Sequence, residues 1–244
     1  MSKILVVIPY CAEGAQGDEL QYAIAGWNKH FKEDFALVVV GDEARVRNGM
    51  WINCPRVQHP DDGNYLPHLD HAHKFQVALG MFPSVDGFIY ACDDMYAVND
   101  FTLEDVKALK YLEDDMGGHL LSPNGWDRDV AKTRNLCVAN DLPVRNWVCH
   151  LPVYFDRKKF QVMYDRFDYA NDSFVVEDVY FNLFHGDEPA TKIDGTDRFR
   201  LGLNEPATPE QIATGMRDKI WITNSPLGWS DTLDRALKNY YGKI

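Results

Sequence analysis

The sequence has few cysteines and no paired cysteine motif. Its five cysteines are scattered along 244 residues, and no two of them are spaced as Cys-x-x-Cys. This pattern argues against a disulfide framework and against a structural zinc site, and it favours a reducing, cytoplasmic location. No stretch approaches the roughly 18 apolar residues of a membrane span. The apolar run Ile4–Ile8 is too short for the core of a signal peptide.

Basic residues are scarce relative to acidic ones. The chain has 25 Lys and Arg against 37 Asp and Glu, which gives a formal net charge of −12. Because nucleic-acid binding relies on clustered Lys and Arg, this balance does not favour a nucleic-acid partner. Hydrophobic residues make up 45% of the chain, which is enough for a packed core, and the length suits one α/β domain.

The first forty residues alternate between apolar runs and a helical stripe. Ile4–Ile8 and Phe35–Val40 are continuous apolar runs, typical of strands buried on both faces. Between them, residues 18–31 carry large apolar side chains at helical spacing, which predicts a helix. The order strand, helix, strand predicts a βαβ unit with a parallel pair of strands.

The rest of the chain continues this alternation, without repeats or an evident linker. Further strands are predicted at Met50–Asn53, Asp86–Cys92, His119–Ser122, Asn146–Phe155 and Lys219–Thr223. Further helices are predicted at Asp70–Met81, Thr102–Met116, Asp156–Asp165, Ser173–His185 and Asp231–Tyr241, with an ordered loop at His59–Leu69. The predicted fold is α/β, a Rossmann-like doubly wound sheet that is mostly parallel, in a single domain over residues 1–244.

An acidic pair follows directly after one of the predicted strands. Asp93 and Asp94 come at the end of the apolar run Phe88–Cys92. In open parallel sheets ligands bind at the carboxyl ends of strands, and two adjacent buried carboxylates raise each other's pKa unless a cation compensates them. Mg²⁺ and similar ions take carboxylate and phosphate oxygens as ligands. A solvated turn or a helix cap also explains an Asp-Asp pair, so its place after a strand is what favours a metal site.

A second acidic segment opens the predicted helix Ser173–His185. Glu177 and Asp178 lie in its first turn, where carboxylates also simply complement the helix dipole. On the functional interpretation, one of them accepts a proton from a substrate hydroxyl, which requires a carboxylate within hydrogen-bond reach. Asp178 is the first candidate for that base and Glu177 the second.

Three histidines lie close together in the run HLDHAH. His68, His71 and His73 could belong to a zinc site, but no further ligand follows at the usual spacing. We therefore expect them on the surface, where a loop enters a helix. Lys74 on the same helix is a candidate phosphate contact.

The segment Trp126–Arg134 is the one local basic cluster. Its plain interpretation is a solvated loop. On the functional interpretation, Trp126 stacks on a sugar and Arg128 contacts an anionic acceptor, which keeps nucleic acid open as an acceptor. Trp229, near the C-terminus, is a further candidate for the acceptor groove.

Together these segments resemble the GT-A glycosyltransferases, which transfer sugars from nucleotide donors. Phe88–Met95, FIYACDDM, is similar to their metal-binding acidic motif, and also to the FIY-x-x-DDM core of the Stealth-type sugar-phosphate transferases. Val6–Tyr10 and Val38–Asp42 resemble the first and second strands of the GT-A fold. Glu177–Asn182 resembles a second acidic segment that such enzymes share.

The resemblance implies how the chain would be organised around a nucleotide sugar. Residues 1–122 would form the GT-A-like half that binds the nucleotide sugar, and residues 123–244 the half that binds the acceptor. Pro9, Tyr10 and Asp42 would contact the nucleotide at the ends of the first two strands.

The resemblance also implies a metal cofactor, Mn²⁺ or Mg²⁺. Asp94 would bridge the metal and the diphosphate, and Asp93 would contact the ribose or a metal-bound water. A histidine is often the third ligand in this family, and His150 and His185 are the candidates. The metal would neutralise the departing nucleoside diphosphate.

The implied activity is transfer of a sugar from a nucleotide-diphosphate sugar, first of all a UDP-sugar, to an acceptor hydroxyl on a glycan or a hydroxymethylated DNA base. A Stealth-type enzyme would instead leave a nucleoside monophosphate. A nucleotidyltransferase is disfavoured because Cys11–Gly17 has no Lys or Arg. A metal-dependent carbohydrate-binding protein without turnover is the alternative that is not an enzyme. The oligomeric state stays open.

Overall fold

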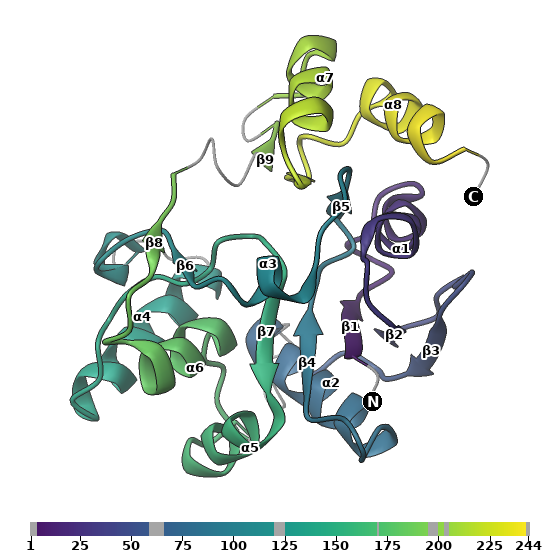
Figure 1. Ribbon diagram of the computed structural model, residues 1–244. Helices are drawn as coiled ribbons and strands as arrows, with labels where there is room; N and C mark the ends of the chain where they lie inside the picture. Colours follow the sequence, from purple (N-terminus) through teal and green to yellow (C-terminus); the bar gives the residue numbers. More distant parts are fainter. Residues whose placement is uncertain are drawn as a thin grey trace.

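A five-stranded sheet forms the centre of the protein. The computed structural model describes residues 4–58, 66–119, 125–169, 171–194, 200–202 and 205–242. The strand order is β3-β2-β1-β4-β7 (Figure 1), where the strands are β1 (Ile4–Tyr10), β2 (Phe35–Gly41), β3 (Met50–Asn53), β4 (Gly87–Tyr90) and β7 (Val153–Asp156). The first four pair in parallel and β7 runs antiparallel to β4. The prediction of an α/β fold with a mostly parallel sheet is confirmed.

Successive side chains of a strand point to opposite faces of the sheet. Both faces of this sheet are therefore apolar, and helices cover each of them. Val6 and Ile8 of β1 face α1 (Glu19–His30), where Trp27 is buried. Leu5 and Val7 face the opposite side, towards α2 (Pro67–Met81) and its buried Phe75. Each face therefore has its own apolar core.

The second half of the chain extends this framework in two directions. The helices α4 (Gly125–Ala139), α5 (Arg157–Arg166) and α6 (Val176–His185) pack beside β7 and α2. A small sheet of β5 (Met95–Ala97), β10 (Trp221–Asn224) and β9 (Arg200–Leu201) packs with α7 (Pro209–Asp218) and α8 (Asp231–Tyr241) against α1, at the top of Figure 1. None of the helices in the described ranges is long and apolar enough to cross a bilayer.

The predicted helix Thr102–Met116 is wrong in its second half. Helix α3 covers only Leu103–Lys107, and β6 (Lys110–Tyr111) follows and pairs in parallel with β8 (Thr191–Lys192). The amine of Lys110 donates to the carbonyls of Asp105 and Ala108, so it satisfies the end of the short helix. Beyond it, the backbone pairs with Asn146 across the chain, which replaces helical hydrogen bonds.

Other segments also differ from the prediction, among them Asn146–Phe155, where strand β7 begins only at Val153. His119 ends a 3₁₀ helix, Met116–His119, and the rest of the predicted strand His119–Ser122 lies outside the described residues, as does most of the predicted loop His59–Leu69. The Trp126–Arg134 cluster is not a loop but part of helix α4. That helix buries one face, which includes Val130, Thr133 and Cys137. Helix α7 was not predicted, although its capping box of Thr208 and Gln211 is a sequence signal for a helix start.

Candidate functional site

The carboxyl ends of β1 and β4 meet at one edge of the central sheet. Val7 is in register with Tyr90, and the amide of Ala91 donates to the carbonyl of Val7 at 3.1 Å. A cavity of about 180 Å³ opens at this edge. Its lining includes Pro9, Tyr10, Glu19, His71, Lys74, Cys92, Asp93, Asp94 and Asn224. The strand ends therefore bring Asp93 and Asp94 to the place where ligands bind in such folds.

Asp93 and Asp94 occupy a tight turn between β4 and β5. The amide of Met95 donates back to the carbonyl of Cys92 at 3.3 Å, which closes the turn. Burial, together with the charge of Asp94, raises the pKa of Asp93 to about 8. Burial raises the pKa of Asp94 to about 6, against the opposing charge of Arg200. Two carboxylates held in this way favour the binding of a cation.

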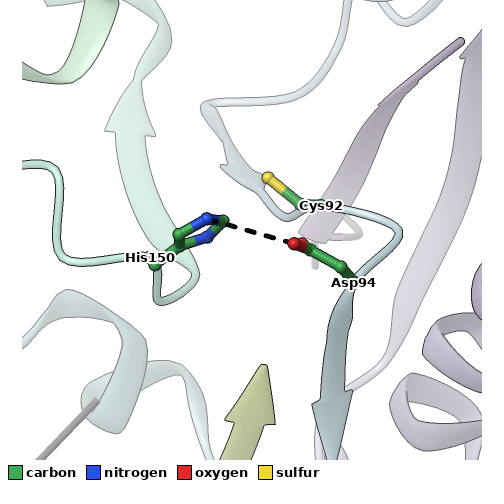
Figure 2. A group of neighbouring side chains, drawn as sticks. All are labelled: Cys92, Asp94 and His150. Atoms are coloured by element: carbon green, nitrogen blue, oxygen red, sulfur yellow. Dashed lines mark ion pairs between the residues drawn. The ribbon is translucent and has the colours of Figure 1, made fainter. Parts of the chain in front are cut away.

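A histidine and a cysteine lie beside Asp94. Ligand atoms of Cys92, Asp94 and His150 all lie within 4.8 Å of one another, and Figure 2 shows Asp94 and His150 pointing toward each other with Cys92 beside them. Nε2 of His150 is 4.0 Å from Oδ2 of Asp94, while Oδ1 of Asp94 has no hydrogen-bond partner among the described residues. An orphaned carboxylate oxygen next to two further ligand atoms fits a bound metal ion.

The position of His150 follows from the topology. Because β7 runs antiparallel to β4, the loop before β7 lies at the carboxyl end of β4. His150 has a backbone φ of 55°, in the left-handed region that histidine adopts more often than most residues. Backbone strain of this kind concentrates at functional sites.

His185, the other candidate ligand, is not brought to Asp94. It ends α6 and lines a different cavity, beside Lys159 and Glu188. Its Nδ1 is 3.1 Å from Oε2 of Glu188, and its Nε2 is 3.4 Å from Nζ of Lys159. We therefore do not retain His185 as a metal ligand.

A second, larger cavity adjoins the first. Its volume is about 560 Å³, and His71 and Cys92 line both cavities. Glu177, Asp178 and His150 also line the second cavity. The two acidic segments, which the sequence separates by more than eighty residues, therefore line neighbouring cavities that share His71 and Cys92.

The two acids of α6 differ in how they are held. Oδ1 of Asp178 accepts a hydrogen bond from the backbone amide of Trp147 at 2.5 Å, so Asp178 fixes the loop that leads to His150. Oε2 of Glu177 has no partner in the described part of the chain, and burial raises the pKa of Glu177 to about 7. Burial also raises the pKa of Asp178, well above its usual range. Oδ2 of Asp178 likewise has no partner there, so the two acids differ in the hydrogen bond that Oδ1 of Asp178 accepts from Trp147.

Lys74 reaches the first cavity with its charge already paired. Its Nζ donates to Oδ2 of Asp70 at 2.6 Å and to the carbonyl of Tyr10 at 2.8 Å. The side chains of Lys74 and Asp70 are 1% and 0% exposed. This pairing makes Lys74 a structural tie between α2 and β1, and weakens its case as a phosphate contact.

The prediction that the HLDHAH histidines lie on the surface is wrong for His68, whereas His71 is half-buried and His73 is exposed. His68 is 1% exposed, and burial lowers its pKa well below the usual range. Burial lowers the pKa of His71 to about 4. Both rings are therefore neutral at physiological pH. They belong to the wall of the second cavity, where the ring centroid of Trp126 lies 4.4 Å from that of His68.

The acceptor candidates separate into one that lines the site and two that lie elsewhere. Trp126 lines the second cavity with 41% of its surface exposed. Arg128 and Trp229 are not among the described residues that line either cavity. Trp229 packs near Tyr22 of α1, with a ring centroid distance of 6.3 Å.

The predicted nucleotide contacts lie at or near the first cavity. Pro9 and Tyr10 line it. Asp42 is close enough for its charge to contribute to the raised pKa of Tyr10, after burial and the charges of Asp93 and Cys11. Cys92 is the site residue that the sequence interpretation missed, and its position directly before the acidic pair was the available signal.

Comparisons with known proteins do not assign a family. No protein-family model and no curated protein matches the chain. Among solved structures, the glycosyltransferase GlyE of Streptococcus pneumoniae TIGR4 matches with a TM-score of 0.47 and 10% identity, over 100% of this chain and 61% of that one. This chain thus spans 61% of the length of that neighbour. A glycosyltransferase involved in the glycosylation of the major capsid of PBCV-1 matches with a TM-score of 0.44 and 7% identity, over 98% of both chains. Likenesses this distant leave the function to be argued from the site.

Proposed function

We propose that this protein is a metal-dependent glycosyltransferase of the GT-A kind, which moves a sugar from a nucleotide-diphosphate sugar to an acceptor hydroxyl. The observation that carries the proposal is the place of Asp93 and Asp94. They lie at the carboxyl end of β4 in the first cavity, which shares His71 and Cys92 with the larger cavity that Glu177 lines. In open α/β sheets this edge is where nucleotides bind.

In this proposal the two cavities divide the substrates between them. The first takes the nucleoside and diphosphate, with Pro9 and Tyr10 along one wall and Asp93 close to the ribose. The second takes the transferred sugar and the acceptor. Trp126 offers a flat apolar surface on which a sugar ring can stack.

Asp94 and His150 would hold the divalent metal, for which the sequence suggests Mn²⁺ or Mg²⁺. The unpartnered Oδ1 of Asp94 and the nearby imidazole support this assignment. When bound, such an ion supplies Lewis-acid stabilisation of a leaving diphosphate.

Glu177 would act as the general base. Its pKa of about 7 lies close to neutral pH, where a carboxylate can accept a proton from the acceptor hydroxyl and later release it. Asp178 stays bound to the amide of Trp147 and positions the loop that carries His150. This assignment reverses the order in which the sequence ranked the two acids.

The test is a product assay on the full chain with a panel of UDP- and GDP-sugars, with Mn²⁺ or with EDTA, and with glycan and hydroxymethylated DNA acceptors. Metal-dependent release of a nucleoside diphosphate with loss of the donor is the expected result. Release of a nucleoside monophosphate would replace the proposal by the sugar-phosphate transferase. Metal-dependent sugar binding without either product would replace it by the carbohydrate-binding protein.

Matched variants make the assay specific for the site. Asp94→Asn is expected to abolish release of the nucleoside diphosphate, while Asp187→Asn, at an exposed position, is expected to leave it unchanged. Equal activity of Asp94→Asn and the unmodified protein would overturn the assignment of Asp94.

A further inference from the structure

We propose that Cys92 is a third ligand of the metal site, and that the site therefore selects a thiophilic divalent ion such as Zn²⁺, Co²⁺ or Fe²⁺ over Mg²⁺. This inference rests on the metal site of the proposed function and not on the identity of the donor or the acceptor. It departs from the sequence-based expectation of Mn²⁺ or Mg²⁺, and from the argument that scattered cysteines exclude a zinc site.

The geometry places one sulfur, one oxygen and one nitrogen around a common point. Sγ of Cys92, a carboxylate oxygen of Asp94 and a ring nitrogen of His150 lie within 4.8 Å of one another. Cys92 and Asp94 come from one tight turn, and His150 approaches from the loop before β7 (Figure 2). Cys92 lines both cavities, so an ion held here would lie at their junction.

The donor set decides which ion suits the site. Thiolate and imidazole ligands favour Zn²⁺ and similar transition ions, whereas Mg²⁺ prefers an all-oxygen octahedral shell. Three protein ligands with a fourth position left for substrate or water is also the usual arrangement of a catalytic zinc site. A site built for Mg²⁺ alone would not need a sulfur atom at this distance.

A second layer of side chains can support a thiolate at Cys92. The hydroxyl oxygen of Tyr90 lies 3.0 Å from Sγ of Cys92, and Nδ1 of His71 lies 3.5 Å from the same oxygen. With a metal bound, Tyr90 can donate its hydrogen to the thiolate while His71 faces the oxygen. Hydrogen bonds of this kind orient metal ligands and tune their basicity.

The surroundings of the turn are rich in carboxyl groups, whose charged forms a bound cation would favour. Glu19, Asp93 and Asp94 line the first cavity, and Glu177 and Asp178 line the second. Among the described residues, one lysine and one arginine line the cavities: Lys74 is paired with Asp70, and Arg200 acts on Asp94 through its charge. The site thus offers carboxylates, which favour a divalent cation, together with a sulfur ligand, which favours a thiophilic one.

The test is a titration of the metal-free full chain with Co²⁺, followed by absorption spectroscopy without nucleotide or sugar. A thiolate bound to Co²⁺ gives a charge-transfer band in the near ultraviolet, which oxygen and nitrogen ligands do not give. The unmodified protein is expected to show this band, and Zn²⁺ is expected to remove it by competition where an equal excess of Mg²⁺ does not.

Two cysteine variants separate the site from other thiols. Cys92→Ser is expected to lose the band and to weaken Co²⁺ binding, while Cys11→Ser is expected to keep both, because Cys11 lines the same cavity but does not belong to the cluster. Tyr90→Phe is expected to keep the band and to weaken binding by about 10- to 100-fold, as loss of an outer-shell partner does.

The outcomes decide the inference whatever the variants do to folding. A Co²⁺ complex of the unmodified protein without a sulfur band overturns it, and so does a band that persists in Cys92→Ser. A sulfur band in a protein that transfers no sugar upholds the metal site and overturns only the glycosyltransferase proposal.

Discussion

The protein buries carboxylates in two contrasting ways. Asp70 of α2 is paired with Lys74 one turn later at 2.6 Å, and both side chains are sealed from solvent. Asp93 and Asp94 are neighbours of each other, and burial raises the pKa of Asp94 although His150 lies 4.0 Å away and the charge of Arg200 acts in the opposite direction. At Asp70, whose partner Lys74 joins α2 to β1, the cation that balances the buried carboxylate is a side chain of the protein itself. At the turn after β4 the chain leaves two acids with raised pKa values, as expected where a cation comes from outside.

The largest effect is expected from breaking the buried ion pair between Asp70 and Lys74. Asp70→Asn leaves the ammonium group of Lys74 buried without its counter-charge, so it should lower the free energy of unfolding by about 3–5 kcal/mol. Urea unfolding at neutral pH measures this, and Lys158→Met on the exposed side of α5 serves as the control. A loss below about 1 kcal/mol, the usual scale of an exposed pair, would contradict the contrast.

The second effect concerns Glu177, whose charge has no partner in the described part of the second cavity. Its folded pKa of about 7 lies above the ordinary 4.5, so folding favours the protonated form. Glu177 alone should therefore lower the stability of the unmodified protein by about 3 kcal/mol as the pH rises from 4.5 through 7.

Glu177→Gln should remove that part of the pH dependence. Denaturant unfolding of both proteins across this pH window gives the difference. Parallel pH curves would show that Glu177 does not carry a raised pKa.

The third effect tests the proposed metal site at Asp94. A metal ion at about 100 times its Kd should stabilise the unmodified protein by about 2.7 kcal/mol. Asp94→Asn should show no such gain, although its metal-free form should be at least as stable as the unmodified protein at neutral pH, because a buried negative charge has been removed. Thermal melts with Co²⁺ and with EDTA measure both. A metal-free Asp94→Asn protein that is much less stable would place Asp94 in the same class as Asp70.

The smallest effect is expected at the rim of the second cavity. Trp126→Ala removes the ring contact with His68 and should cost about 0.5–1.5 kcal/mol of stability, because Trp126 is partly exposed. It should weaken acceptor binding while leaving metal binding unchanged. Isothermal titration with metal and then with acceptor separates the two, and loss of metal binding would contradict this placement.

Much of the sheet could be predicted because its strands are short apolar runs with turn residues at their ends. β1, β2 and β3 lie where the sequence pattern predicts them, and the acidic pair indeed follows a buried strand. The pattern failed after Thr102, where Leu109 and Leu112 continue a helical spacing that the backbone does not follow. Backbone hydrogen bonds with Asn146 determine the conformation of that segment, and the local sequence gives no sign of such a distant partner.

The site was harder to predict because its parts meet through topology. Nothing in the sequence shows that β7 pairs with β4 and so brings His150, rather than His185, beside Asp94. Cys92 carries no ligand motif of its own, because no second cysteine lies at a metal-binding spacing from it. The pairing of Lys74 did have a signal, since Asp70 lies four residues earlier on the same helix.

The antiparallel contact between β4 and β7 has a consequence for the order of assembly. Two members of the metal cluster, Cys92 and Asp94, lie in the turn after β4, and the third, His150, lies in the loop before β7, so the cluster exists only when β4 and β7 are paired. An ion bound there would hold β7 to β4, and local separation of the two strands would release it. The amides of Val153–Asp156 should accordingly exchange their hydrogens more slowly when the metal is bound.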